Sequence, residues 1–162
     1  MHACLSGQPC CIVQWEINLG ALEFSKILAS KVFNASSQGG YDGLFSFVSS
    51  DPPLIGKSET AFGQCSYKSV SATSGEAKVP CALFKGFHIP EGSRMQKQSD
   101  ELSFAVYATS PTSCTIKAMS RTKLVSVNCD EGRNYQNLQN VMLNLGVQSY
   151  VETTLYGCPQ KR

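Results

Sequence analysis

Residues 101–120 read ELSFAVYATSPTSCTIKAMS, and this stretch decides the fold class. Apolar and polar side chains alternate along it, which is the pattern of a half-buried β-strand. The turn-forming triplet Ser110-Pro111-Thr112 divides it into two such strands, so we expect an antiparallel hairpin. The alternating apolar positions are Leu102, Phe104, Val106, Cys114, Ile116 and Ala118.

A third strand is predicted directly after this hairpin. Ser120-Arg121 is interpreted as the connecting turn, and Val125, Val127 and Cys129 continue the alternation. The three segments together predict an antiparallel meander.

The first half of the chain predicts one more strand and a helix. Apolar side chains alternate at Val13, Trp15, Ile17 and Leu19, as in a strand. The period then changes over 21–33, where the apolar side chains fall on one stripe of a helix. That stripe consists of Phe24, Ile27, Leu28 and Val32. We expect this amphipathic helix to pack on the sheet.

Shorter apolar segments predict the remaining strands. They lie at 44–48, 64–70, 80–89 with a break at Gly86, and 151–156. Residues 141–147 alternate as a strand would, but Leu138, Met142 and Leu145 also fit helical spacing, so this element stays open. The pattern predicts a mainly β or α+β fold with about six to eight antiparallel strands and one helix. The 162 residues are expected to form a single domain, 1–162.

Eight cysteines span the chain, and none of them forms a Cys-x-x-Cys pair. An even count at such spacings favours disulfides and an extracellular protein over a metal site. Adjacent cysteines cannot bond each other without strain, so Cys10 and Cys11 should join two different places. His2 with Cys4, Cys10 and Cys11 is the one local group of possible zinc ligands, and the adjacent pair strains it. No metal and no cofactor are predicted. The expected disulfide cysteines are Cys4, Cys10, Cys11, Cys65, Cys81, Cys114, Cys129 and Cys158.

Composition restricts the function classes. The net charge is +2 and 16% of the residues are charged, so neither a nucleic acid nor a charged membrane is an expected partner. No apolar run is long enough for a transmembrane helix. The first residues, Met1 to Cys4, do not resemble a signal peptide, so a secreted protein would be in its mature form here. Asn34-Ala35-Ser36 is a sequon, which predicts glycosylation at Asn34.

Catalytic side chains are few. The only histidines are His2, near the terminus, and His88, between two apolar residues. No Gly-x-Ser-x-Gly motif is present. The acid pairs Asp100-Glu101 and Asp130-Glu131 are interpreted as solvated residues at turns. We therefore expect no catalysis, and a small hydrolase using His88 remains an alternative.

Basic and aromatic residues predict a binding surface. Lys117, Arg121 and Lys123 cluster around the second predicted turn of the meander, where a solvated sheet edge is the alternative interpretation. Such a cluster suits an acidic partner or a glycan. Tyr107 is predicted to belong to the same binding surface, because a tyrosine side chain provides a large contact area at a low cost in conformational entropy.

Two resemblances to known families bear on the fold. The predicted strand-helix-strand-strand order is similar to the cystatin-type roll, but the chain lacks that family's Gln-x-Val-x-Gly loop, so protease inhibition is not implied. Short fragments also follow the order seen in ependymin-related secreted proteins, which implies a lipid-binding sheet with a hydrophobic cleft. This resemblance covers less than a third of the chain, the spacings differ, and Cys11 and Cys81 lack counterparts. The fragments are Pro9-Cys10, Trp15-Glu16, Tyr41-Asp42-Gly43, Gln64-Cys65, Ile89-Pro90, Leu145-Gly146 and Cys158.

These observations favour a secreted, non-catalytic binding protein that presents loops on a disulfide-stapled β scaffold. The alternative within binding is a carrier with a pocket for a lipid or small apolar ligand between the sheet and the helix over 21–33. Protein, glycan and lipid ligands all remain open, as do the disulfide connectivity and the oligomeric state.

Overall fold

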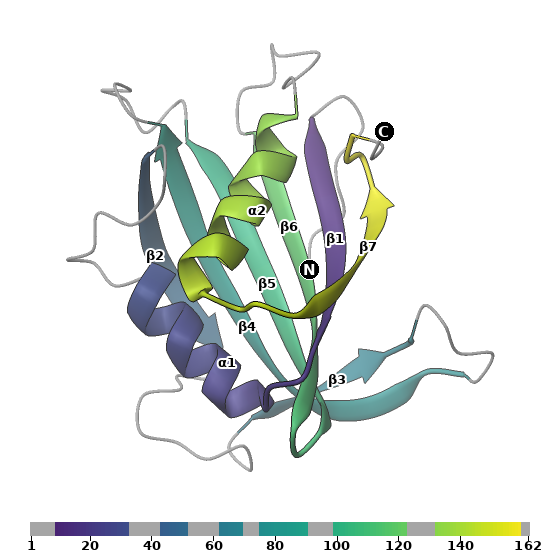
Figure 1. Ribbon diagram of the computed structural model, residues 1–162. Helices are drawn as coiled ribbons and strands as arrows, with labels where there is room; N and C mark the ends of the chain where they lie inside the picture. Colours follow the sequence, from purple (N-terminus) through teal and green to yellow (C-terminus); the bar gives the residue numbers. More distant parts are fainter. Residues whose placement is uncertain are drawn as a thin grey trace.

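Seven strands of the computed structural model form one antiparallel sheet (Figure 1). The structure describes residues 9–32, 43–51, 62–69, 75–90, 99–122 and 132–159. Within these ranges the strands are β1 (Cys10–Ile17), β2 (Gly43–Asp51), β3 (Gly63–Tyr67), β4 (Ala77–Pro90), β5 (Asp100–Ser110), β6 (Ser113–Thr122) and β7 (Tyr150–Tyr156). The mainly β architecture expected from the alternating pattern is confirmed.

The strand order is β2-β4-β5-β6-β1-β7, and β3 pairs with β4. The predicted hairpin is confirmed as β5 and β6. The predicted turn at Ser120-Arg121 is wrong, because β6 continues to Thr122 and both residues pair with β5 on one side and β1 on the other. The strand on the other side of β6 is therefore β1, which precedes it in the chain, and not a segment that follows it. The third strand predicted at 125–129 lies outside the described residues.

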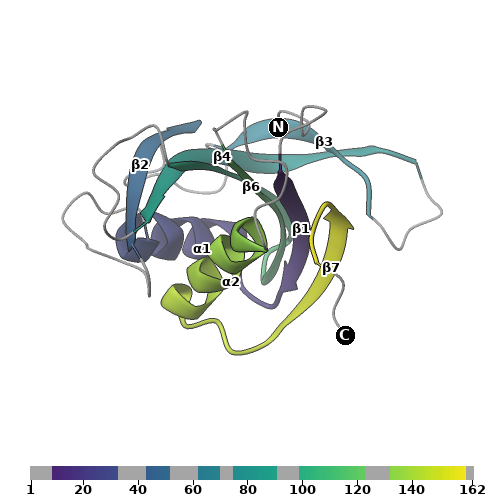
Figure 2. The same cartoon turned by 90° about the horizontal axis from the view of Figure 1, so that it is seen from above.

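Two helical segments cover one face of the sheet, and β3 lies on the other side (Figure 2). The first is α1 (Ala21–Ile27), which continues into a π-helical turn, η1 (Leu28–Val32). It confirms the helix expected over 21–33 as far as Val32, the last described residue there. The second is α2 (Arg133–Leu145).

The ambiguous segment 141–147 is helical up to Leu145, where α2 ends. Leu138, Val141, Met142 and Leu145 fall at positions i, i+3, i+4 and i+7 and are all buried, so the helical period takes precedence over the strand-like alternation. Gly146 has a φ of 71°, the left-handed conformation that commonly terminates a helix.

Strand β4 is continuous across Gly86, where a break had been predicted. Gly86 pairs with Phe47 on β2 and with Leu102 on β5, so it lies within the sheet, although the β2 register shifts by one residue directly beside it. A glycine weakens a strand but does not end it when both neighbours supply ladder hydrogen bonds.

The core lies between the sheet and the helices. Trp15 is fully buried at 0% exposure and stacks on Phe104 of β5, with 6.4 Å between the ring centroids. From the helical side, Phe24 and Leu28 are also fully buried, as the amphipathic pattern predicts. These side chains fill the space between α1 and the sheet.

Two disulfides between described residues link neighbouring strands of the sheet. Cys11–Cys158 joins β1 to the segment after β7 across 147 residues, and Cys65–Cys81 joins β3 to β4 across 16 residues. Gly157 allows the first bridge: its φ is 64°, and a Cβ there would lie 2.1 Å from the carbonyl oxygen of Cys10. Only glycine permits the chain after β7 to approach β1 this closely.

Replacing the central tryptophan tests the core. We expect Trp15→Ala to lower the free energy of unfolding by about 3–5 kcal/mol, because it leaves a cavity against Phe104. Chemical denaturation followed by circular dichroism measures this loss. A loss of less than about 1 kcal/mol, or water-exposed tryptophan emission in the native wild type, would contradict the burial of Trp15.

Candidate binding surface

An aromatic and lysine cluster lies on the sheet face opposite the helices. The Lys117 ammonium is 5.8 Å from the centroid of the Tyr107 ring and 5.9 Å from that of Tyr67. The two rings are themselves in contact, with 5.0 Å between centroids and 41° between planes. The Tyr67 hydroxyl donates to Thr115 Oγ1 at 3.2 Å. We call Tyr67, Tyr107 and Lys117 the Tyr–Lys cluster.

Three strands and one disulfide hold the Tyr–Lys cluster in place. Tyr107 lies on β5, Lys117 on β6 and Tyr67 at the end of β3. Strand β3 pairs with the beginning of β4, and Cys65–Cys81 links the same two strands two residues from Tyr67. Cys81 in turn pairs with Tyr107 in the β4–β5 register, so the bridge fixes the position of one ring relative to the other.

The ammonium of Lys117 is held by rings and not by a carboxylate. Among the described residues, no ion pair involves Lys117, and its register partners are Gln14 on β1 and Ala105 on β5. A cation held over aromatic faces keeps its N–H donors for another acceptor. Burial raises the pKa of the Tyr107 phenol, with a further contribution from Tyr67, so this ring is neutral beside the cation.

The other predicted basic residues do not belong to this cluster. Arg121 lies on the same face of β6, four residues from Lys117, but forms an ion pair with Glu101 on β5. Both Lys117 and Arg121 lie on a central strand, so they do not protect a sheet edge. Lys123 lies outside the described residues. The structure thus brings together two of the predicted residues, Tyr107 and Lys117. The prediction missed Tyr67, which is 50 residues away from Lys117 in the sequence.

Asp100 and His88 are not exposed, which corrects the interpretation of Asp100 as a solvated turn acid. Asp100 is 0% exposed and accepts hydrogen bonds from Arg133 Nε at 3.0 Å, Arg133 NH2 at 3.2 Å and Asn137 Nδ2 at 2.9 Å. His88, also 0% exposed, is the register partner of Asp100 on β4. The local sequence could not reveal this, because Arg133 follows 33 residues later. Asp130-Glu131 lie outside the described residues.

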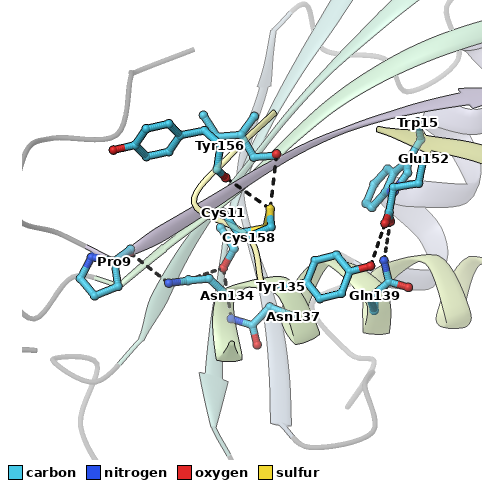
Figure 3. Close-up of a disulfide and its surroundings, with 12 residues drawn as sticks. Pro9, Cys11, Trp15, Asn134, Tyr135, Asn137, Gln139, Glu152, Tyr156 and Cys158 are labelled. Atoms are coloured by element: carbon cyan, nitrogen blue, oxygen red, sulfur yellow. Dashed lines mark hydrogen bonds between the residues drawn. A yellow bond between two sulfur atoms is a disulfide. The ribbon is translucent and has the colours of Figure 1, made fainter. Parts of the chain in front are cut away.

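A polar network continues from Asp100 along the amino-terminal part of α2, and Figure 3 shows its members Pro9, Asn134 and Asn137. Asn137 Nδ2 donates to Ser120 Oγ at 3.2 Å, and Ser120 Oγ donates to Asn134 Oδ1 at 2.7 Å. Asn134 Nδ2 donates to the Pro9 carbonyl and to Thr122 Oγ1, both at 3.0 Å. The network joins α2 to β6 and to the start of β1.

A second carboxylate, Glu152 on β7, faces the other side of α2 (Figure 3). It accepts hydrogen bonds from Trp15 Nε1 at 3.0 Å, from the Tyr135 hydroxyl at 2.7 Å and from Gln139 Nε2. Burial and the bond to Glu152 raise the pKa of the Tyr135 phenol well above its ordinary value of 10.0. Glu152 therefore fastens β7 to both α2 and β1.

Five of the eight cysteines that were predicted to form disulfides are disulfide-bonded in the structure. Cys10 is disulfide-bonded in addition to the two bridges described above, so neither Cys10 nor Cys11 is available to a zinc ion. Cys114 differs from the prediction, because it is a buried thiol. Its register partners are Ile17 and Ala108, so the sheet places no cysteine opposite it. Cys4, Cys129 and the sequon residue Asn34 lie outside the described residues.

One cavity of about 650 Å³ lies between α1 and the turn that joins β5 to β6, where Leu22 and Lys26 of α1 face Pro111 and Thr112. Another of about 280 Å³ is lined by Glu16, Cys114 and several serine and threonine residues. Among the described residues, no group of three or more His, Cys, Asp or Glu could hold a metal ion, and no helix is long and apolar enough to cross a membrane.

Comparison with known proteins gives no relative: no family model, no curated protein and no solved structure matches this chain.

The raised pKa of Tyr135 predicts a pH dependence of stability. Because the folded state holds the phenol proton more tightly than the unfolded state, its contribution is complete below the ordinary value of 10.0 and is lost as the pH rises above it. We expect the free energy of unfolding of the wild type to fall more steeply between about pH 10 and about pH 12 than that of Tyr135→Phe. Urea denaturation at each pH measures the two slopes.

Tyr156→Phe is the matched control, since this phenol is 59% exposed. It should follow the wild-type slope. Equal slopes for wild type and Tyr135→Phe would show that the Tyr135–Glu152 bond does not stabilise the fold.

Proposed function

We propose that the protein is a secreted, non-catalytic binding protein whose binding face contains the Tyr–Lys cluster. The disulfides Cys11–Cys158 and Cys65–Cys81 support an oxidising, extracellular location. Glycosylation at Asn34 and a single domain over 1–162 are part of this proposal. The observation that carries it is Lys117 held over two tyrosine rings without a carboxylate partner among the described residues.

An acidic saccharide is the ligand class that this chemistry favours. Tyr107 is buried at 8% exposure, so the half-buried Tyr67 is the ring that a ligand can reach. A tyrosine ring offers a flat apolar face beside a polar hydroxyl, which suits the mixed surface of a sugar. An ammonium group beside it supplies charge-assisted hydrogen bonds to a sulfate or carboxylate. The Cys65–Cys81 bridge fixes the strand that carries Tyr67, so little conformational entropy is lost on binding.

The two alternative functions have less support. A carrier for lipid or a small apolar ligand needs space between α1 and the sheet, where Trp15, Phe24 and Leu28 are packed at 0% exposure. A hydrolase needs a base that reaches its substrate, whereas His88 is fully buried. A carrier whose pocket lies in this packed core would require the helical layer to move, and a hydrolase that uses His88 would require the end of β4 to move.

Binding to a sulfated oligosaccharide tests the proposal, with the uncharged parent oligosaccharide as the comparison. We expect the sulfated probe to bind preferentially and Lys117→Gln to weaken binding about tenfold, equivalent to about 1.4 kcal/mol. Lys85→Gln is the matched control, because it removes the same charge from an exposed position on β4 away from both rings. Isothermal titration calorimetry at constant salt measures the affinities.

Lys85→Gln should change the affinity by less than about twofold. Equal losses for the two variants would indicate binding by net charge alone and contradict a site at the Tyr–Lys cluster. Failure of the wild type to distinguish the sulfated from the uncharged probe would contradict the ligand class.

A further inference from the structure

Strand β7 leaves one edge of the sheet open to another strand. Among the described residues it pairs only with β1, and it is the last strand in the sheet order (Figures 1 and 2). Its large apolar side chains are unusually accessible: Val151 is 63% exposed, Tyr156 59% and Leu155 38%. An edge with these properties is a template for strand addition.

The sequence of β7 lacks the basic residues and proline that commonly protect a sheet edge. YVETTLY has no lysine, arginine or proline. Its only charged residue, Glu152, points inward, and its charge is satisfied by hydrogen bonds from Trp15, Tyr135 and Gln139. The same contacts, together with Cys11–Cys158, hold β7 in place before any partner arrives.

The order of residues in β7 indicates the partner. If two copies of the strand pair antiparallel about Thr153, Val151 lies opposite Leu155 of the partner subunit, and Glu152 lies opposite Thr154 of the partner subunit. Thr153 then lies opposite its own copy. Aliphatic residues face aliphatic ones and polar residues face polar ones, the type of cross-strand pair that stabilises a sheet. A two-fold symmetric interface requires this self-complementarity.

We propose that β7 pairs with β7 of a second copy of the chain, with Thr153 on the two-fold axis, and joins two seven-stranded sheets. The centre of the proposed pairing is regular, because Val151 and Thr153 pair with Glu16 and Gln14 of β1 on the face opposite the helices. The register on β1 shifts at Leu155, so the irregularity lies at the outer ends of the proposed interface. This dimer does not use the Tyr–Lys cluster and stands independently of the proposed ligand.

An engineered cysteine on the axis tests the register. Paired Cα atoms in an antiparallel sheet are about 4.5–5.5 Å apart, which a disulfide can bridge. Thr153→Cys should therefore form a covalent dimer under mild oxidation. Val151→Cys is the matched control, because the two copies of residue 151 would be roughly 13 Å apart in this register. Non-reducing electrophoresis and peptide mapping identify the bond between the two copies of residue 153.

Sedimentation velocity provides a second readout that requires no new cysteine. The wild type should show a concentration-dependent dimer, Val151→Lys should shift the equilibrium to monomer, and Leu143→Lys should not. Leu143 is the control because it is 65% exposed on α2, away from the edge. A monomeric wild type at all concentrations, or cross-linking of Val151→Cys as fast as Thr153→Cys, would overturn the proposal, and a monomer would leave the edge to a different partner.

Discussion

The fold depends on satisfying one carboxylate that has no access to water. Asp100 is the first residue of β5 and is completely buried where β5 meets β6 and β4. An isolated buried carboxylate is strongly unfavourable, and it persists only when paired and hydrogen-bonded. Arg133 and Asn137 supply those partners from consecutive turns of α2. A helix packed on the sheet without Arg133 and Asn137 at these positions would leave Asp100 buried and unpaired, so the carboxylate determines where α2 docks.

The position of α2 also determines where β7, the last described strand, lies. Tyr135 and Gln139 of α2 hold Glu152, and Glu152 also accepts the indole N–H of Trp15 from the core. Strand β7 is thereby placed beside β1, and Cys158 reaches Cys11 through the glycine turn at Gly157. Two carboxylates, one on each side of α2, thus connect the helix to opposite parts of the sheet. With the helices on one face, the Tyr–Lys cluster is formed on the other.

The parts of this structure that could be predicted from sequence are those encoded by local pattern. The alternation in residues 101–120 gave the β5–β6 hairpin, and the stripe containing Phe24 and Leu28 gave the first helix. Long-range partners were not visible. Asp100 resembles a turn residue until Arg133 is known to lie beside it, and Tyr67 joins Lys117 only through the pairing of β3 with β4. The ambiguous period at 141–147 was decided by burial against the sheet.

The free energy of unfolding in a double-mutant cycle at Asp100 and Arg133 tests the central claim most directly. Arg133→Leu should cost about 3–5 kcal/mol, because it leaves the buried carboxylate with Asn137 as its main described partner. Asp100→Asn should cost less, since the Arg133 side chain is 37% exposed and can reach water. We expect that adding Asp100→Asn to Arg133→Leu restores part of the lost free energy of unfolding. If the losses of the two single variants instead add up in the double variant, the Asp100 carboxylate does not depend on its partners from α2, and this interpretation of the fold is wrong.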